Sequence, residues 1–318
     1  MSDSPRLRLV FMGTPAIAAP ALAALTAAGH ELVLVVAQPD RPAGRGRQLR
    51  RGAVAAAADA LGLCVAQPER AREIIDRLAQ LKPDALAVMA FGQLLPPGLL
   101  AIPRLGAVNV HTSLLPALRG AAPIQRAVMN GLDETGVTTM LMDAGLDTGA
   151  ILLQRATPIG PQETAGQLAE RLAAIGAGLL VETLAGLAAG AIAPIPQDEA
   201  QASLAPRLSK DEGLIDWSRP AKELDWLVRG ADPWPGAYTF LSGQPLRLFA
   251  PTLVVPGDPG APPGTILPAP VGGGWLLVAA GQGALGVGQV QAAGKRRLAA
   301  GDFARGARLA PGLRLGAA

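Results

Sequence analysis

Short apolar runs alternate with helical stretches along the first half of the chain. The apolar runs occupy residues 7–12, 31–37, 63–66, 84–90 and 107–111. Between them the apolar residues recur at helical spacing, at residues 16–28, 52–61 and 70–81. Continuous apolar strands separated by helices are typical of a parallel sheet covered on both faces. We therefore predict a doubly wound, mostly parallel α/β domain of Rossmann-like type, in which ligands bind beyond the carboxyl ends of the strands.

The pattern continues to about residue 190 and then changes. Two more strands are predicted at residues 137–142 and 151–155, and a helix running to about residue 130 begins at Pro123, which suits a first turn. A long helix is predicted at residues 164–189. The following stretch is rich in Pro, Gln and Ala and has no clear period, which is typical of a linker. We expect domains at residues 1–190 and 208–318, joined by a linker at 191–207.

The C-terminal part alternates short strands with Gly and Pro turns. Five strands are predicted at residues 237–241, 245–255, 264–267, 275–280 and 284–291, and a helix near 223–230. Five short strands at this spacing favour a small β-barrel of the OB type.

Composition narrows the class of protein. Half of the 318 residues are hydrophobic, so the chain can bury more than one core. Its single cysteine, Cys64, excludes an internal disulfide and a cysteine-based zinc cluster, and its apolar neighbours predict a buried strand. The first residues lack a signal-peptide pattern, and Gly or Pro interrupts the long apolar runs. We expect a cytoplasmic protein without a membrane segment and, since no apolar stripe demands association, a monomer.

Positive charge is concentrated in two places although the net charge is only +3. The first cluster holds Arg41, Arg45, Arg47, Arg50 and Arg51, and its Pro and Gly residues predict an exposed, mobile loop. The second holds Lys295, Arg296, Arg297, Arg305 and Arg308. Either cluster alone is compatible with a solvated surface. Two clusters in two domains favour a long polyanion over a single small phosphate.

Two motifs are absent from the chain. Gly13-Thr14-Pro15 occupies the first strand-to-helix turn, where dinucleotide-binding proteins carry G-x-G-x-x-G. The sequence also contains no G-x-x-x-x-G-K-[ST] phosphate loop. NAD and ATP chemistry are therefore disfavoured.

A candidate catalytic group lies between residues 109 and 147. Asn109 and His111 are two apart in a predicted strand, so their side chains share a face. Asp147 lies in a glycine-flanked loop that can return a carboxylate to His111. An amide, an imidazole and a carboxylate together suit transfer of an acyl-type group to an amine. A structural histidine is the alternative for His111, and Asp143 is a rival carboxylate that more plausibly braces its loop.

Motifs along nearly the whole chain resemble the folate-dependent formyltransferase family, and within it the members that act on methionyl-tRNA. The segments that carry the resemblance are F-M-G-T-P (11–15), A-Q-P-D-R-P-A-G-R-G-R (37–47), F-G-Q-L-L-P (91–96), N-V-H-T-S-L-L-P (109–116), R-G-A-A-P-I-Q-R (119–126), M-D-A-G-L-D-T-G (142–149), L-S-K-D-E-G-L-I-D-W (208–217), P-W-P-G-A (233–237) and D-F-A-R-G-A-R-L-A-P-G (302–312). The chain departs from the family pattern at Ala16-Ile17 and at Ala117-Leu118.

The resemblance implies a reaction and a set of site residues. It implies that Asn109, His111 and Asp147 are catalytic, that 10-formyltetrahydrofolate is the formyl donor, and that the acceptor is the α-amine of methionine on initiator tRNA. No metal is implied. The implied folate-binding residues are Phe91, Gly92, Gln93, Leu94, Leu95, Ser113, Leu114, Leu115 and Pro116. The implied tRNA-binding residues are Arg41, Arg45, Arg47, Lys295, Arg296 and Arg297.

Two other functions remain open on the residues alone. One is formyl transfer to a small amine such as a nucleotide or a sugar. The other is RNA binding by a protein whose α/β domain has lost its activity.

Overall fold

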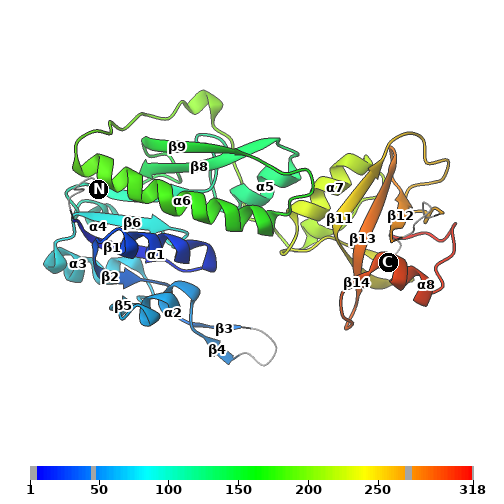
Figure 1. Ribbon diagram of the computed structural model, residues 1–318, viewed down its shortest axis with the longest axis horizontal. Helices are drawn as coiled ribbons and strands as arrows, with labels where there is room; N and C mark the ends of the chain where they lie inside the picture. The colour runs from blue at the N-terminus through cyan, green and yellow to red at the C-terminus, as the bar shows by residue number, and fades with distance from the viewer. Residues whose placement is uncertain (1–5, 44–47, 269–273, 317–318) are drawn as a thin grey trace. The chain divides into compact units, whose positions relative to one another are not determined.

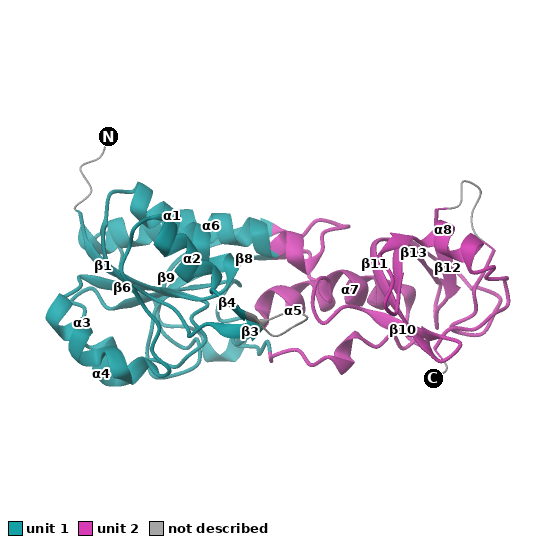
Figure 2. Cartoon of the chain, turned by 90° about the horizontal axis from the view of Figure 1, so that it is seen from below, with its two compact units in different colours: residues 1–121, 135–157, 169–205 teal, residues 122–134, 158–168, 206–318 magenta. Residues whose placement is uncertain are grey.

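The chain forms two compact units, coloured separately in Figure 2. The computed structural model describes residues 6–43, 48–268 and 274–316. Unit 1 comprises residues 1–121, 135–157 and 169–205, and unit 2 comprises residues 122–134, 158–168 and 206–318. The predicted linker is therefore divided, because its residues up to 205 belong to unit 1.

Unit 1 is built on a seven-stranded sheet. In spatial order its strands are β5 (Val65–Ala66), β2 (Glu31–Val36), β1 (Arg8–Gly13), β6 (Ala85–Met89), β7 (Ala107–His111), β8 (Glu134–Leu141) and β9 (Ile151–Pro158). The pairs from β5 to β7 are all parallel, which confirms the predicted fold class. β8 runs antiparallel to β7. The fully parallel arrangement of strands does not extend past β7, because the chain between β7 and β8 passes through residues of unit 2 and makes no crossover within unit 1.

Helices cover both faces of this sheet. Figure 2 shows α1 and α6 over one face and α3 and α4 over the other. Their bounds are α1 (Ala19–Ala27), α2 (Ala53–Ala60), α3 (Ile75–Leu81), α4 (Pro97–Leu100) and α6 (Ala165–Ala188). Val10, Met12 and Val88 pack with Leu78 and Leu99 into a buried core. With both faces covered, the carboxyl edge of the strands is left to carry polar chemistry.

Two local expectations for unit 1 are wrong. The basic stretch after residue 40 forms two short antiparallel strands, β3 (Arg41–Ala43) and β4 (Gln48–Arg50), and Arg45 and Arg47 lie outside the described residues (Figure 1). Cys64 is exposed rather than buried. It precedes β5, a two-residue strand at the sheet edge, where a short apolar run has a partner on one side only.

Unit 2 is a small β-barrel with one long helix packed on it. Its strands are β10 (Tyr238–Leu241), β11 (Gln244–Val255), β12 (Leu276–Ala279), β13 (Ala284–Ala292) and β14 (Leu298–Ala299), and the path runs β10-β11-β13-β12. Its helices are α5 (Pro123–Met129), α7 (Ala221–Gly230) and α8 (Ala300–Gly306).

Irregular segments close this barrel. Ile266 bridges to Val278 of β12, and its amide donates to the carbonyl of Leu313. Gly316 in turn donates to the carbonyl of Phe240 in β10. The predicted strand at 264–267 is thus a bridging segment, and the predicted barrel is confirmed.

The long helix α6 meets the length and composition of a membrane span. Its apolar residues include Leu172, Leu179, Leu180 and Leu184, which are all buried against the rest of the protein. Burial of this kind is the normal state of a core helix in a water-soluble domain, which passes the same test as a span.

Candidate active site

Strand β7 presents Asn109 and His111 on one face, at the carboxyl edge of the parallel strands. Val110, between them, points to the opposite face, where its side chain lies against Gly176 of α6. The alternation follows from the two-residue period of a strand. Both polar side chains are buried, with at most 9% of their surface exposed. A buried amide and imidazole at this edge are unusual in a strand that is otherwise apolar, and they mark the site.

His111 lies between a backbone carbonyl and a carboxylate. Its Nε2 is 3.0 Å from the carbonyl oxygen of Leu118, and its Nδ1 is 3.6 Å from Oδ2 of Asp147. A carbonyl oxygen only accepts, so Nε2 carries the hydrogen. In the neutral ring Nδ1 then carries a lone pair and can take up a proton next to the carboxylate. The 3.6 Å separation exceeds a direct hydrogen bond and matches a loosely paired group that one proton would tighten.

The carboxylate of Asp147 is held by backbone. Its Oδ2 accepts a hydrogen bond of 2.9 Å from the amide of Gly120. Asp147 itself has a φ of 54°, a left-handed conformation that costs a residue other than glycine about 1–3 kcal/mol. Asp143 bonds to the amide of Gly145 and to the hydroxyl of Thr148 within the same loop. Asp147 therefore faces His111, and Asp143 braces the loop, as expected.

The amide of Asn109 is available to a ligand. Among the described residues of the chain, its side chain makes no hydrogen bond although it is buried. A buried amide without a partner costs free energy, so its retention at the edge of the sheet is typical of a group that serves a substrate. Asn109 and His111 can then donate to, or hold, one oxygen in front of them.

The two loops expected to bind folate follow neighbouring strands. Residues 91–95 follow β6 and residues 113–116 follow β7, so both loops leave the same edge of the sheet. Gln93 ties the first loop down, since its side chain accepts from the amide of Ala71 and donates to the carbonyl of Glu69. Leu94 is 75% exposed. An exposed leucine between anchored neighbours offers apolar surface at this edge.

Thr138 of β8 organises the second loop and was missed from the sequence. Its hydroxyl donates to the carbonyl of Ser113 and accepts from the amide of Leu115. It also accepts from Nε2 of Gln154 in β9, which in turn donates to the carbonyl of Leu115. The signal was weak, because Thr138 looks like any β-branched strand residue. Only its register opposite His111 places it under the loop.

Arg119 and the segment after residue 191 were missed as well. The buried guanidinium of Arg119 donates to Oε1 of Gln197 and to both carboxylate oxygens of Glu199. The hydrogen bonds to Glu199 raise the pKa of Arg119, and those from Arg119 lower the pKa of Glu199. Ser203 accepts from the amide of Leu118. The absence of any period in this segment indicated only a linker.

The departure at Ala117-Leu118 is absorbed by backbone contacts. The carbonyl of Ala117 accepts from the hydroxyl of Ser113, and the carbonyl of Leu118 faces His111. Neither contact uses a side chain of the two departing residues. The site geometry around His111 is therefore independent of which side chains stand there.

The basic residues differ in how far they are engaged. Arg41, Lys295 and Arg296 are exposed. The guanidinium of Arg297 lies 3.8 Å from the ring centroid of Phe249 and 3.8 Å from a carboxylate oxygen of Asp232. Arg297 thus has a structural role in unit 2, and Lys295 and Arg296 extend from the same turn, between β13 and β14.

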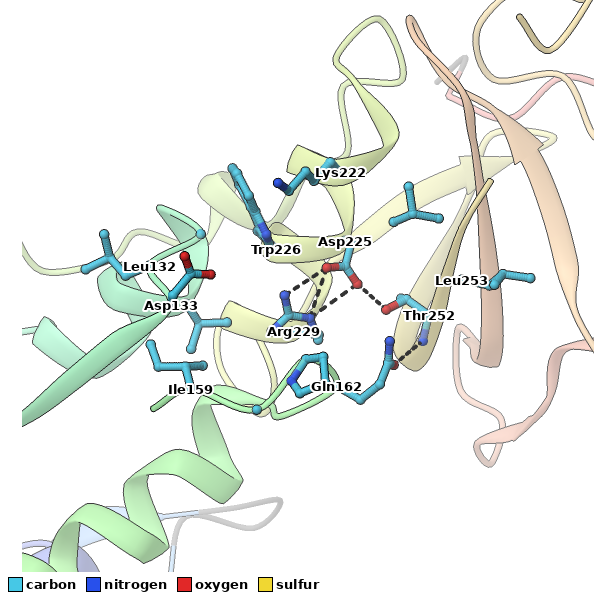
Figure 3. A pocket seen from close by; sticks show the side chains of 15 residues that line it. Leu132, Asp133, Ile159, Gln162, Lys222, Asp225, Trp226, Arg229, Thr252 and Leu253 are labelled. Atoms are coloured by element: carbon cyan, nitrogen blue, oxygen red, sulfur yellow. Dashed lines mark hydrogen bonds and ion pairs between the residues drawn. The ribbon is translucent and has the colours of Figure 1, made fainter. Parts of the chain in front are cut away.

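Unit 2 contains a cavity of about 450 Å³ that none of the expected site residues lines (Figure 3). Its floor is the buried pair Asp225–Arg229, joined by the hydroxyl of Thr252. Arg229 also donates to the carbonyl of Glu163, and Gln162 accepts from the amide of Thr252. These polar groups satisfy one another, which is typical of structural pairing between segments of one unit. Nowhere in the described ranges do three or more His, Cys, Asp or Glu side chains gather in a group that could hold a metal ion.

Comparison with known proteins agrees with this geometry. Residues 7–184 match the family described as formyl transferase, and residues 207–308 match the formyl transferase C-terminal domain. Proteins named methionyl-tRNA formyltransferase are similar over the full length. The one from Solibacter usitatus is 49% identical over 98% of this chain and 99% of its own, and the one from Citrifermentans bemidjiense is 48% identical over 98% and 96%.

The fold is shared more widely. An N-formyltransferase from Helicobacter canadensis, solved with folinic acid and dTDP-3-aminofucose, superposes with a TM-score of 0.67 at 15% identity, covering 88% of this chain and 98% of that one. At that identity the likeness shows the fold alone. The chain therefore belongs to the formyl transferase family, among the methionyl-tRNA formyltransferases.

Proposed function

We propose that this protein transfers the formyl group of 10-formyltetrahydrofolate to the α-amine of methionyl initiator tRNA, in the cytoplasm and as a monomer. The observation that carries the proposal is the placement of Asn109, His111 and Asp147 at one sheet edge, in a chain 49% identical to enzymes of this name. The formyl product, N-formylmethionyl-tRNA, serves translation initiation.

Asn109 and His111 act on the formyl oxygen. When the acceptor amine attacks the formyl carbon, a tetrahedral intermediate forms and negative charge develops on that oxygen. Donors fixed where the charge appears are usually the largest catalytic contribution. The amide of Asn109 and the protonated ring of His111 can supply two such donors from one strand face.

Asp147 stabilises the protonated ring of His111. The attacking nitrogen must lose a proton, and the leaving N10 of the folate must gain one as the C–N bond breaks. Nδ1 of His111, 3.6 Å from the carboxylate, can hold that proton between the two events. Bond formation and cleavage then balance without a further reactant. Since only the neutral amine attacks, the rate falls at low pH.

The loops at 91–95 and 113–116 bind the folate, and basic side chains bind the tRNA. The first set lies beside His111 on adjacent strand ends, which suits a ligand whose reacting atom must reach that residue. Arg41, Lys295 and Arg296 are exposed and positive, as contacts to phosphates require. Arg45, Arg47 and Arg297 are proposed for the same role.

The acceptor is tested by comparing substrates with the intact chain. Formyl transfer from 10-formyltetrahydrofolate is measured with initiator Met-tRNA, elongator Met-tRNA and an amino-sugar nucleotide. We expect initiator Met-tRNA to be used with the highest kcat/KM. Preference for the amino-sugar nucleotide would instead favour the small-amine function, and salt-dependent RNA binding without any formyl transfer would favour a binding protein.

A further inference from the structure

Part of the expected linker lies against the catalytic loops of unit 1. Ile195 exchanges two backbone hydrogen bonds of 2.8 Å with Ile151 in β9. Further along, the amide of Arg119 donates to the carbonyl of Ser203, and the amide of Ala205 donates to the carbonyl of Arg119. Residues 195–205 are therefore anchored at both ends, and we refer to them as the strap.

Gln197, within the strap, uses its whole hydrogen-bonding capacity on the site. Its Oε1 accepts from Nε and Nη2 of Arg119, at 3.0 and 2.8 Å. Its Nε2 donates to the carbonyls of Asp147 and Gly149, at 2.8 and 2.7 Å. A guanidinium only donates and a carbonyl only accepts, so the amide has a single possible orientation. Turning it over would oppose donor to donor and acceptor to acceptor.

These contacts hold the residue that most needs to be held. Asp147 is in a left-handed conformation, which persists only where its surroundings impose it. Gly120 fixes its carboxylate, but Gln197 fixes its backbone, and Gly149 on the other side has no room for a side chain, because a Cβ there would lie 1.7 Å from the carbonyl of Leu141. The direction of the carboxylate depends on both holds.

We propose that Gln197, oriented by Arg119, is a positioning residue that sets the carboxylate of Asp147 opposite His111. The inference rests on the proposed function and adds a residue of the strap to that site. It also gives the strap a role beyond connecting two parts of the chain.

Replacing the amide by an isosteric apolar group isolates the effect. Gln197→Met keeps the length of the side chain and removes both donors and the acceptor. Gln201→Met is the matched control, since Gln201 lies in the same strap, is exposed, and bonds only to Asp198. Gln197→Glu is a second variant, which presents carboxylate oxygen to two carbonyl oxygens and keeps the bond to Arg119.

The readouts are kcat and KM for formyl transfer to initiator Met-tRNA. We expect Gln197→Met and Gln197→Glu to lower kcat roughly 10- to 100-fold, as misplacement of a catalytic group by about 1 Å does, with KM for both substrates nearly unchanged. Gln201→Met should behave as the parent protein. An unchanged kcat, or a change confined to KM, would overturn the inference.

A double-mutant cycle shows whether Gln197 acts through Asp147. Asp147→Asn removes the charge that Gln197 positions, so adding Gln197→Met to Asp147→Asn should lower kcat little further. Fully additive losses would overturn the inference, because they would mean that Gln197 acts elsewhere.

One structural readout separates this inference from the proposed function. If the parent protein transfers no formyl group, the proposed function fails. Hydrogen exchange at the amides of residues 143–149 then decides the positioning role. We expect faster exchange there in Gln197→Met and not in Gln201→Met. Equal exchange in both variants would overturn the inference even if the enzyme is active.

Discussion

At the scale of single residues, the site is a set of side chains whose partners leave no choice of role. His111 has a carbonyl at one nitrogen and a carboxylate near the other. Asn109 is buried, and no described residue of the chain bonds to its amide. Both residues owe their position to the alternation of β7, because a shift by one residue would turn them to the face of α6.

His30, the other histidine, predicts a pH dependence of stability. Its Nδ1 accepts from the amide of Leu7, and burial lowers its pKa from the ordinary value of about 6.5. The unfolded chain therefore binds the proton more readily, so His30 costs stability as the pH falls below about 6.5 and costs nothing well above it.

The measurement compares the protein with His30→Gln, which can accept the same bond without titrating. Urea unfolding between pH 8 and 5 should show the variant gaining on the parent as the pH falls. Parallel curves over that range would contradict the prediction.

At the scale of elements, the sequence predicts strands and helices well but not what lies between them. The alternation of apolar runs was sufficient for β1, β2, β6 and β7, because a doubly covered strand must be apolar on both sides. Thr138 and Gln197 could not be found in this way. Their roles depend on which strand lies beside β7 and on where the strap returns, and neither follows from local pattern.

The close approach of α6 to β7 predicts opposite effects for two glycines of one helix. A Cβ at Gly176 would lie 2.8 Å from Cγ1 of the buried Val110, between the two site residues of β7. A Cβ at Gly178 would meet nothing within 4 Å. We expect Gly178→Ala to stabilise the protein by about 0.5–1 kcal/mol, the usual gain in a helix. Gly176→Ala should instead destabilise it by about 1–3 kcal/mol through overpacking.

Both free energies come from urea unfolding, and kcat adds a second check. Since Gly176 lies behind the strand of Asn109 and His111, Gly176→Ala should also lower kcat, whereas Gly178→Ala should not. Equal effects of the two substitutions would contradict the packing described here.

At the scale of the whole molecule, two units share the labour of one reaction. Unit 1 carries Asn109, His111, Asp147 and the strap, and unit 2 carries the exposed Lys295 and Arg296. The sequence anticipated the fold class of each part. It could not show that the units interleave, since residues 122–134 and 158–168 join unit 2 through packing and not through their local pattern.

The basic turn predicts a salt dependence of tRNA binding. Lys295→Ala combined with Arg296→Ala should weaken binding at low salt and reduce the slope of log K against log salt by about 1–2, because each lost phosphate contact releases about one counterion fewer. Arg104→Ala is a control of like charge, since Arg104 is exposed but paired with Asp84. An unchanged slope in the double variant would remove this turn from the tRNA-binding surface.

The central claim is that His111, between Asn109 and Asp147, drives formyl transfer to methionyl-tRNA. The most direct test is the single-turnover rate of formyl transfer to initiator Met-tRNA by the parent protein and by His111→Ala, with both substrates saturating. Loss of one donor to the developing oxyanion predicts a fall on the order of 10²–10³-fold, at an unchanged affinity for tRNA. A His111→Ala rate close to that of the parent protein would contradict the claim.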